Sequence, residues 1–341
     1  MSNSKIYKIG VIGVGVWGCH SLERELVNTN MCEIKSICGG DEFGAALYKD
    51  TVKASKDYAQ EFNAGYIVNP EDIINDPEID IISVMCAPSI KAEWLIKALQ
   101  NNKYVVTDKP LGLTLEDAQA VCEAEAKSKA HGFMLGGYHI RPAVCKLIDM
   151  INAGKLGEVK SVSLRLNFTG GIYLGFEPTE RWGSEIPGGE SVTIGSHGLI
   201  TAMKLIGAPV EDVFQIRKND FYEKYKSVGA DDYAIYNLKF TNGAVANVSV
   251  GRLPYRIPNE DIVIELTGTE GYAHINGTEL KTYPDGEIFD GKFSAPELTC
   301  DVFKQFIHSI TDKNTSPLTS FKDGLTIQQI FDKYKKTSEE K

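Results

Sequence analysis

The 341-residue sequence lacks the features that mark membrane proteins and metal-binding proteins. No apolar run reaches the ~20 residues that span a bilayer, so we predict no membrane partner. The apolar part of the start, "MSNSKIYKIGVIGVGVWG", is interrupted by glycines and has no cleavage pattern, so we expect no signal peptide. The six histidines are dispersed without HxxxH spacing, and we predict no metal site.

Paired cysteines and an excess of basic residues are also missing. The seven cysteines are odd in number and show no CxxC spacing, which favours thiols in a reducing, cytoplasmic environment. The 46 acidic residues outnumber the 36 lysines and arginines, which gives a formal net charge of -10. Because such a surface repels phosphate backbones, we predict no nucleic-acid partner.

What the first part of the chain does contain is a regular alternation of strand and helix signals. Nearly continuous apolar strands separated by helices predict a doubly wound parallel sheet, a Rossmann domain, over residues 1–138. The predicted strands are 8–13, 33–38, 65–68, 79–86, 103–108 and 132–137, and the predicted helices are 17–28, 42–62, 89–100 and 115–129.

The pattern changes after residue 141. One helix, 142–154, precedes longer runs with period-two alternation, which predict an α/β domain with a large, open, mostly antiparallel sheet. We assign this domain to residues 139–341 and expect the closing helices, 297–311 and 322–336, to pack back on the body. The predicted strands are 159–168, 232–240, 244–253 and 261–269.

A GxGxxG motif lies between the first predicted strand and the first helix. In this context Gly13 makes a tight turn, Gly15 lets the backbone approach a pyrophosphate, and Gly18 lets the helix pack closely. With Val16 and Trp17, these residues predict a dinucleotide site. Asp41, after the second strand, is the candidate partner of the adenosine ribose, which favours NAD; NADP stays possible.

The stretch "TDKPLG" ends the strand 103–108. Strands of a doubly wound sheet point their carboxyl ends at the ligand, so Asp108 and Lys109 should face the bound dinucleotide. A lysine held there can donate to a substrate hydroxyl or stabilise a developing alkoxide. The alternative is a loop lysine that pairs with Asp108.

Three motifs together give the chain a family resemblance. The N-terminal GxGxxG loop, "DKPLGLTLEDA" at 108–118 and "GGESVTIGSHG" at 188–198 resemble the Gfo/Idh/MocA oxidoreductases, the group of glucose-fructose oxidoreductase and inositol dehydrogenase. The resemblance covers nearly the whole chain. It implies a Rossmann domain, a second domain whose open sheet forms subunit contacts, and hydride transfer between nicotinamide and a sugar or cyclitol carbon.

The resemblance also assigns residues. Lys109 matches the motif lysine, and His197 matches a histidine that we expect at a helix start, where it takes the substrate's hydroxyl proton. Thr193 occupies the position of the family's aspartate, and Lys91 stands where a histidine is common. The predicted catalytic pair is therefore Lys109 and His197. The other predicted cofactor contacts are Cys86, Ala87, Lys91, Asp108, Lys109 and His139; the predicted substrate contacts are Lys109, Tyr138, Arg165, Tyr173, Trp182, Thr193 and His197.

These residues predict an NAD(P)-dependent dehydrogenase that acts on a hydroxyl-bearing carbon of a small carbohydrate-like molecule. Because the second sheet needs one face covered, we expect a homodimer or homotetramer. Two alternatives stay open. One is redox-neutral, NAD-dependent cleavage of a glycoside, and the other is a non-enzymatic dinucleotide-binding sensor.

Overall fold

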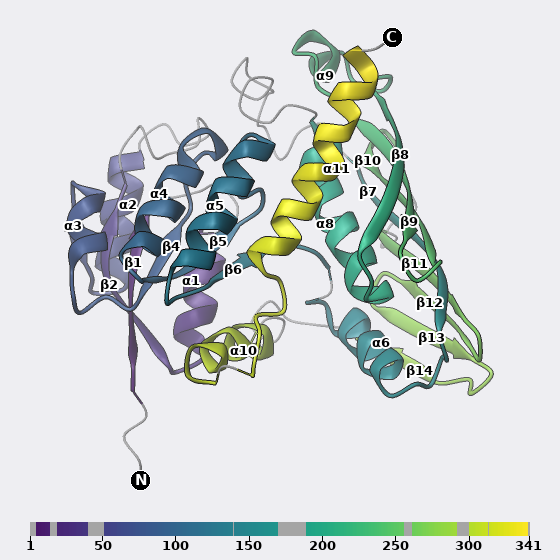
Figure 1. Cartoon of the computed structure of the whole chain (residues 1–341), viewed down its shortest axis with the longest axis horizontal. Helices are drawn as coiled ribbons and strands as arrows, with labels where there is room; N and C mark the ends of the chain where they lie inside the picture. Colours follow the sequence, from purple (N-terminus) through teal and green to yellow (C-terminus); the bar gives the residue numbers. More distant parts are fainter. Residues whose placement is uncertain are drawn as a thin grey trace. The chain divides into compact units, whose positions relative to one another are not determined.

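The computed structural model describes residues 5–13, 19–39, 51–138, 140–169, 189–255, 261–291, 300–312 and 314–339. The chain divides into two compact units. The first comprises Met1–Leu135 and Thr299–Asp332, and the second comprises Gly136–Leu298 and Lys333–Lys341. Figure 1 shows the elements of both units, coloured along the sequence.

The first unit is built on a parallel sheet of six strands in the order β3-β2-β1-β4-β5-β6. Its central strands are apolar and fully buried, with Ile9, Val11 and Ile12 at 0% exposure. This is the burial expected of strands covered on both faces. The Rossmann prediction is confirmed. The strands are β1 (Tyr7–Ile12), β2 (Cys32–Cys38), β3 (Gly65–Ile67), β4 (Ile81–Val84), β5 (Tyr104–Asp108) and β6 (Gly132–Leu135).

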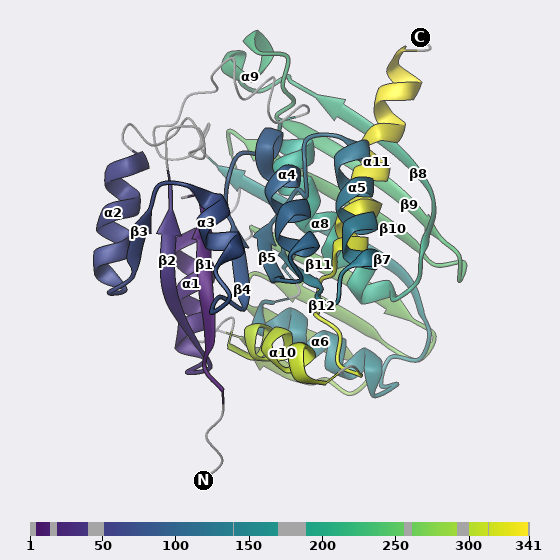
Figure 2. The ribbon, with the colours of Figure 1, turned by 60° about the vertical axis from the view of Figure 1, so that its left-hand side comes forward.

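Local signals explain where the helices of the first unit begin. Asn69 caps α3 by accepting from the amide N–H of Glu71, and Thr114 forms a reciprocal capping box with Asp117 at the start of α5. Helices α4 and α5 lie side by side in both views (Figures 1 and 2). The helices are α1 (Cys19–Asn28), α2 (Thr51–Glu61), α3 (Pro70–Asn75), α4 (Pro88–Gln100) and α5 (Leu115–Lys127).

The closing helices also contribute to the first unit. Phe306 of α10 (Cys300–Thr311) stacks on Phe133 of β6 with a centroid distance of 5.6 Å, and Phe321 at the start of α11 (Phe321–Glu339) is fully buried. These aromatic contacts explain why Thr299–Asp332 belongs to the first unit, although we assigned this stretch to the second domain. The division falls between Leu135 and Gly136 rather than after residue 138.

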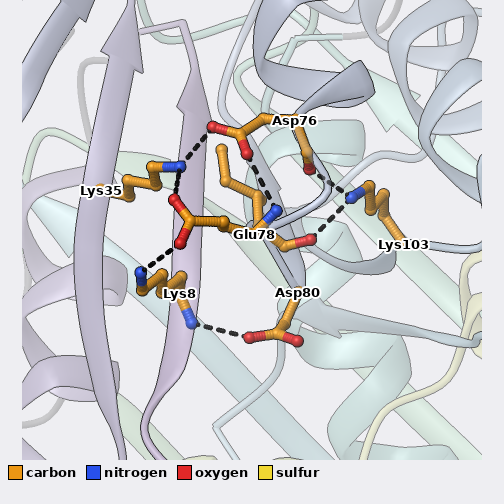
Figure 3. Close-up of polar contacts among 7 residues, drawn as sticks. Lys8, Lys35, Asp76, Glu78, Asp80 and Lys103 are labelled. Atoms are coloured by element: carbon orange, nitrogen blue, oxygen red, sulfur yellow. Dashed lines mark hydrogen bonds and ion pairs between the residues drawn. The ribbon is translucent and has the colours of Figure 1, made fainter.

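A charged network ties the amino ends of the strands together (Figure 3). Lys35 of β2 bonds Asp76 at 2.6 Å and Glu78 at 2.5 Å, and Lys8 of β1 reaches the same Glu78 at 3.3 Å. The ammonium group of Lys103, just before β5, donates to the carbonyls of Asp76 and Ile79 at 2.6 and 2.7 Å. The loop before β4 thereby links three strands at the edge opposite their carboxyl ends.

The second unit is built on a mixed sheet of eight strands in the order β14-β13-β12-β11-β7-β10-β9-β8. Only β7 and β10 pair in parallel; the other neighbours are antiparallel. The prediction of a mostly antiparallel sheet is confirmed. The strands β8, β12, β13 and β14 were not predicted. The strands are β7 (Val159–Thr169), β8 (Val210–Lys218), β9 (Tyr233–Phe240), β10 (Val245–Leu253), β11 (Ile262–Gly268), β12 (Tyr272–Asn276), β13 (Glu279–Tyr283) and β14 (Ile288–Asp290).

Helices of the second unit cover one face of this sheet. Helix α8 (Glu190–Ile206) packs on β7, β9 and β10, while α6 (Pro142–Asn152) packs on β12 and β13; the short α9 (Glu223–Ser227) precedes β9. Among the described residues no helix covers the opposite face (Figure 1). That face exposes apolar side chains of β8 and β10, with Phe214 at 63% and Val245 at 49% exposure.

Candidate active site

The carboxyl ends of β1 and β4 meet where the strand order of the first sheet reverses. Gly13 follows β1 with φ +85°, and a Cβ there would lie 2.9 Å from the carbonyl carbon of Met85 and 3.0 Å from the amide nitrogen of Cys86. Only glycine fits both the conformation and the space. The crevice at such a switch point is where doubly wound sheets bind dinucleotides, and a bare backbone there fits NAD. The other motif residues, Gly15, Val16, Trp17 and Gly18, lie outside the described residues.

The end of β2, where the adenosine ribose should bind, is fixed by side chains that bond the main chain. The thiol of Cys38 donates to the carbonyl of Val68 at 3.2 Å, and the hydroxyl of Tyr66 donates to the carbonyl of Gly39 at 2.9 Å. Asp41, the predicted ribose partner, lies outside the described residues, so its role stays a prediction.

Cys86 and Ala87, both buried, connect β4 to α4. Burial raises the pKa of the Cys86 thiol to about 12, although Lys91 opposes the shift. The thiol is therefore protonated at neutral pH and is a small apolar neighbour for a ligand rather than a nucleophile. Whether these two residues contact the cofactor stays a prediction.

Asp108 and Lys109 lie at the carboxyl end of β5, next to β4, as predicted. Lys109 is half-buried, and its amide N–H donates to the carbonyl of Leu135 in β6 at 3.2 Å. Lys91 of α4 is buried, with its ammonium group bonded to the Asp108 carboxylate and, at 3.1 Å, to the Asp108 carbonyl. The predicted contact of Lys91 with the cofactor stays a prediction; its observed partner is Asp108.

A buried acid, Glu23, belongs to the same unit. Glu23 of α1 is fully buried and accepts a hydrogen bond from the hydroxyl of Ser83 in β4. Burial raises the pKa of Glu23 to about 8, and the charge of Asp108 adds to the increase. At neutral pH Glu23 is therefore mostly neutral, which leaves Asp108 as the carboxylate that compensates the charge of Lys91.

In the second unit, His197 is held by a main-chain donor. The amide N–H of Gly137 donates to Nδ1 of His197 at 3.0 Å. A backbone N–H can only donate, so the neutral ring carries its proton on Nε2. Helix α8 begins at Glu190, so His197 lies in its second turn rather than at the helix start, beyond the reach of the helix dipole. The expectation that His197 stands at a helix start is therefore wrong.

The segment that carries Gly137 is attached to α8 at several points. The amide N–H of Tyr138 donates to the hydroxyl oxygen of Thr201 at 2.7 Å, and that hydroxyl donates to the carbonyl of His197 at 2.7 Å. The ring of Tyr138 packs edge-on against the ring of His197 with centroids 5.4 Å apart, and Arg141 lies over the tyrosine at 4.7 Å. Tyr138 and His197, both predicted site residues, are thus brought together.

The start of α8 is fixed by Asp231, a residue that the sequence did not reveal. Its Oδ1 accepts from the amide N–H of Ser191 at 2.6 Å and its Oδ2 accepts from the Ser191 hydroxyl at 2.7 Å. Gly189 has φ +65°, and a Cβ there would lie 2.3 Å from the carbonyl oxygen of Asp231. Burial raises the pKa of Asp231 to about 7, while its bonds to Ser191 oppose the increase.

A buried ion pair adds to this anchor. Glu190, fully buried, accepts from Nε of Arg252 at 2.6 Å and from the hydroxyl of Tyr225 on the same oxygen. Within the described ranges nothing donates to its other oxygen, Oε2. Arg252 is 3% exposed. It joins β10 to the first turn of α8.

The remaining described substrate candidates, Thr193 and Arg165, lie on opposite sides of the eight-stranded sheet. Thr193 lies one turn before His197 on α8 and is half-buried. Arg165 alternates with the inward-facing Leu164 and Leu166, so its exposed side chain lies on the face of the sheet away from α8. The structure therefore does not bring Arg165 to His197. His139, Tyr173 and Trp182 lie outside the described residues.

Two absences complete the description of the site. None of the described helices is long and apolar enough to cross a membrane. Within the same residues, no group of three or more His, Cys, Asp or Glu side chains is arranged to hold a metal ion.

The fold and the dinucleotide crevice define an oxidoreductase with an NAD-binding Rossmann domain. Family models agree: residues 7–136 match the "Oxidoreductase family, NAD-binding Rossmann fold" model, and residues 144–274 match the "GFO/IDH/MocA C-terminal domain" model. The chain belongs to the Gfo/Idh/MocA oxidoreductase family. The predictions of the family, the fold class, an enzyme and NAD as cofactor are confirmed.

Individual relatives are distant. The chain is 29% identical over 282 residues to scyllo-inositol 2-dehydrogenase (NAD(+)) of Bacillus subtilis, an alignment that covers 79% of this chain and 73% of the relative. It is 29% identical to inositol 2-dehydrogenase of Salmonella typhimurium over 44% of this chain and 43% of that protein. The solved structure of levoglucosan dehydrogenase with NADH and levoglucosan matches with TM-score 0.82, 20% identity and 96% coverage of both chains. At that identity the match supports the fold alone.

Proposed function

We propose that this protein is an NAD-dependent dehydrogenase that oxidises a secondary hydroxyl of a sugar, sugar derivative or cyclitol. The observation that carries the proposal is Lys109. Its main chain is fixed at the carboxyl end of β5, beside the β1–β4 switch point where the dinucleotide binds. A half-buried lysine at that place can take the proton of a substrate hydroxyl as the neutral amine and return it as the ammonium.

The hydrogen bond from Gly137 changes the role that we assigned to His197. A neutral histidine can accept a substrate proton on Nε2 only if its own proton is on Nδ1. That Nδ1–H would then point at the amide N–H of Gly137, and two donors cannot bond each other. We therefore propose that His197 donates a hydrogen bond from Nε2–H to the substrate oxygen. Lys109, as the neutral amine, accepts the hydroxyl proton.

These roles give a balanced reaction. When bound, NAD supplies the acceptor for the hydride that leaves the carbinol carbon. Lys109 removes the proton from the hydroxyl oxygen, and His197 stabilises the negative charge that develops there. The C–H and O–H bonds break, a carbonyl forms, and the products are the ketone, reduced cofactor and one proton. In the reverse direction the Lys109 ammonium returns the proton.

The substrate class rests on the relatives. The proteins similar to this chain include dehydrogenases named for inositol, D-xylose and levoglucosan, all molecules with several vicinal hydroxyls. Thr193 at the position of the family's aspartate has a hydroxyl rather than a carboxylate. A substrate hydroxyl that a carboxylate would bind must therefore find a weaker partner here. This favours a substrate other than a simple inositol.

The test is a substrate panel with purified protein and either NAD or NADP. Sugars, sugar acids, cyclitols and glycosides are each scored for the absorbance of reduced nicotinamide and for reaction products. Formation of NADH with one class supports the dehydrogenase and identifies that class. Cleaved glycoside without net NADH would support the redox-neutral alternative, and unchanged substrate in every assay would support the sensor.

We also propose a homo-oligomer, in which a second copy covers the open face of the eight-stranded sheet. Phe214 and Ile216 of β8 and Val245 of β10 are 63%, 42% and 49% exposed, and covering them would remove apolar surface from water. Light scattering on the purified protein should give the mass of a dimer or tetramer. Replacing Phe214 with glutamate should lower that mass if the face is the contact.

A further inference from the structure

The buried ammonium group of Lys91 is the feature that the proposed chemistry leaves unused. Lys91 is 1% exposed in the first turn of α4, and its side chain reaches across to the end of β5. There it bonds two parts of one residue, the carboxylate and, at 3.1 Å, the carbonyl of Asp108. Because Lys91 bonds both groups, it restrains the main chain at Asp108 as well as the side chain.

The bonds around Asp108 fix the residue that follows it. The hydroxyl of Thr107, just before Asp108, donates to the carbonyl of Val84 in β4 at 2.7 Å, and the amide N–H of Lys109, just after it, donates to Leu135 at 3.2 Å. Pro110 and Leu111 beyond it are buried. The peptide that carries Lys109 is thus held on both sides, and Lys91 supplies the charged part of the restraint.

The Lys91–Asp108 pair affects stability through charge as well as through packing. An ammonium group withdrawn from water is costly unless an anion compensates it, so Lys91 depends on Asp108. The Asp108 side chain is 34% exposed and can be solvated without its partner. Removing Lys91 should therefore loosen the end of β5 more than it destabilises the unit, whereas neutralising Asp108 should leave a buried cation uncompensated.

We propose that Lys91 is a positioning residue that acts through Asp108 to place the Lys109 amine for proton transfer. The inference rests on the proposed function, since it assumes that Lys109 acts on substrate. It differs from the cofactor contact that the sequence suggested, because it requires no contact between Lys91 and NAD.

The test compares Lys91→Met with Lys103→Met. Both lysines donate to main-chain carbonyls next to β5, Lys91 from α4 at the carboxyl end and Lys103 at the amino end, in the network of Figure 3. We expect Lys91→Met to lower kcat roughly 10- to 100-fold, the effect of misplacing a reacting group by about 1 Å. The NAD dissociation constant should stay within about twofold, and Lys103→Met should leave kcat within about twofold.

A double substitution shows whether Lys91 acts through Lys109. In a Lys109→Ala background, Lys91→Met should change the residual rate less than about twofold, because no amine is left to position. An equal loss in both backgrounds would overturn the proposal, as would a weakened NAD affinity in Lys91→Met. Full activity of Lys109→Ala would instead contradict the proposed function.

Amide hydrogen exchange tests the positioning role of Lys91 without a measurement of enzyme activity. Exchange of the Lys109 amide should accelerate in Lys91→Met and not in Lys103→Met, because only the former releases the peptide at the carboxyl end of β5. Unchanged exchange in Lys91→Met would overturn the positioning role even if the enzyme proved active. Accelerated exchange in a protein that turns over no polyol would support the positioning and reject the proposed function.

Discussion

The amide N–H of Gly137 donates to Nδ1 of His197 at 3.0 Å, and this single bond decides which chemistry the histidine can perform. The ring is left with a proton on Nε2, so in its neutral form it is a hydrogen-bond donor. Tyr138, the residue after Gly137, is tied to Thr201 on the next turn of α8, which keeps the donor in place. In the proposed function, proton transfer is then assigned to Lys109.

Substitution of His197 by its two amide analogues separates donor from base. Glutamine can place an amide N–H near the position of Nε2, whereas asparagine can accept from Gly137 but has no donor there. We expect His197→Asn to lose roughly 10²- to 10³-fold in kcat and His197→Gln to lose clearly less. Neither amide can accept a proton, so equal losses in steady-state kinetics would favour His197 as the base. The affinity for NAD in both variants serves as the control.

Asp231 makes the stability of the second unit dependent on pH. Burial raises its pKa from 3.8 to about 7, so between these values the folded protein holds a proton that the unfolded chain has lost. This contribution to stability is fully present below about pH 4 and is lost as the pH rises through about 7. In Asp231→Asn, which can keep both bonds to Ser191, thermal unfolding should depend less on pH across that window. A profile that parallels the wild type would show that another group carries the dependence.

The Glu190–Arg252 pair should be costly to break from one side. Both residues are nearly inaccessible, so Arg252→Met leaves a buried carboxylate without its cation and should destabilise the protein by about 3–5 kcal/mol. Adding Glu190→Gln removes the uncompensated charge and should recover part of that loss in urea unfolding. If the double variant is no more stable than Arg252→Met, the charge is not the source of the cost.

Much of the fold could be predicted from local pattern. Neighbouring residues suffice to predict the buried strands of the first sheet, the capping box at Thr114 and the start of α3 at Pro70. Strand β8 was missed because most of its side chains are exposed or half-buried, which leaves no long apolar run to recognise. The start of α8 was placed too late because the residue that caps it, Asp231, is 40 positions from Ser191 in the sequence.

The site was predictable in its residue types and not in its contacts. Motif spacing and the family resemblance indicated Lys109 and His197 as candidates, but the partners of such buried groups are distant along the chain. Gly137 is 60 residues from His197, and Glu190 is 62 residues from Arg252. Lys91 shows the same limit. Its position, where the family commonly has a histidine, suggested a cofactor contact, and only the packing of α4 against β5 reveals that Asp108 compensates its charge.

The most direct test of the account is the initial rate of NADH formation, measured against pH for the wild type and for Lys109→Met with the best polyol of the panel. We predict that the wild-type rate rises with pH, because the neutral amine of Lys109 accepts the proton. Lys109→Met should bind NAD normally yet lose roughly 10²- to 10⁴-fold in rate, together with that dependence on pH. NADH formation by Lys109→Met at the wild-type rate, or none by the wild type with any polyol, would contradict the account.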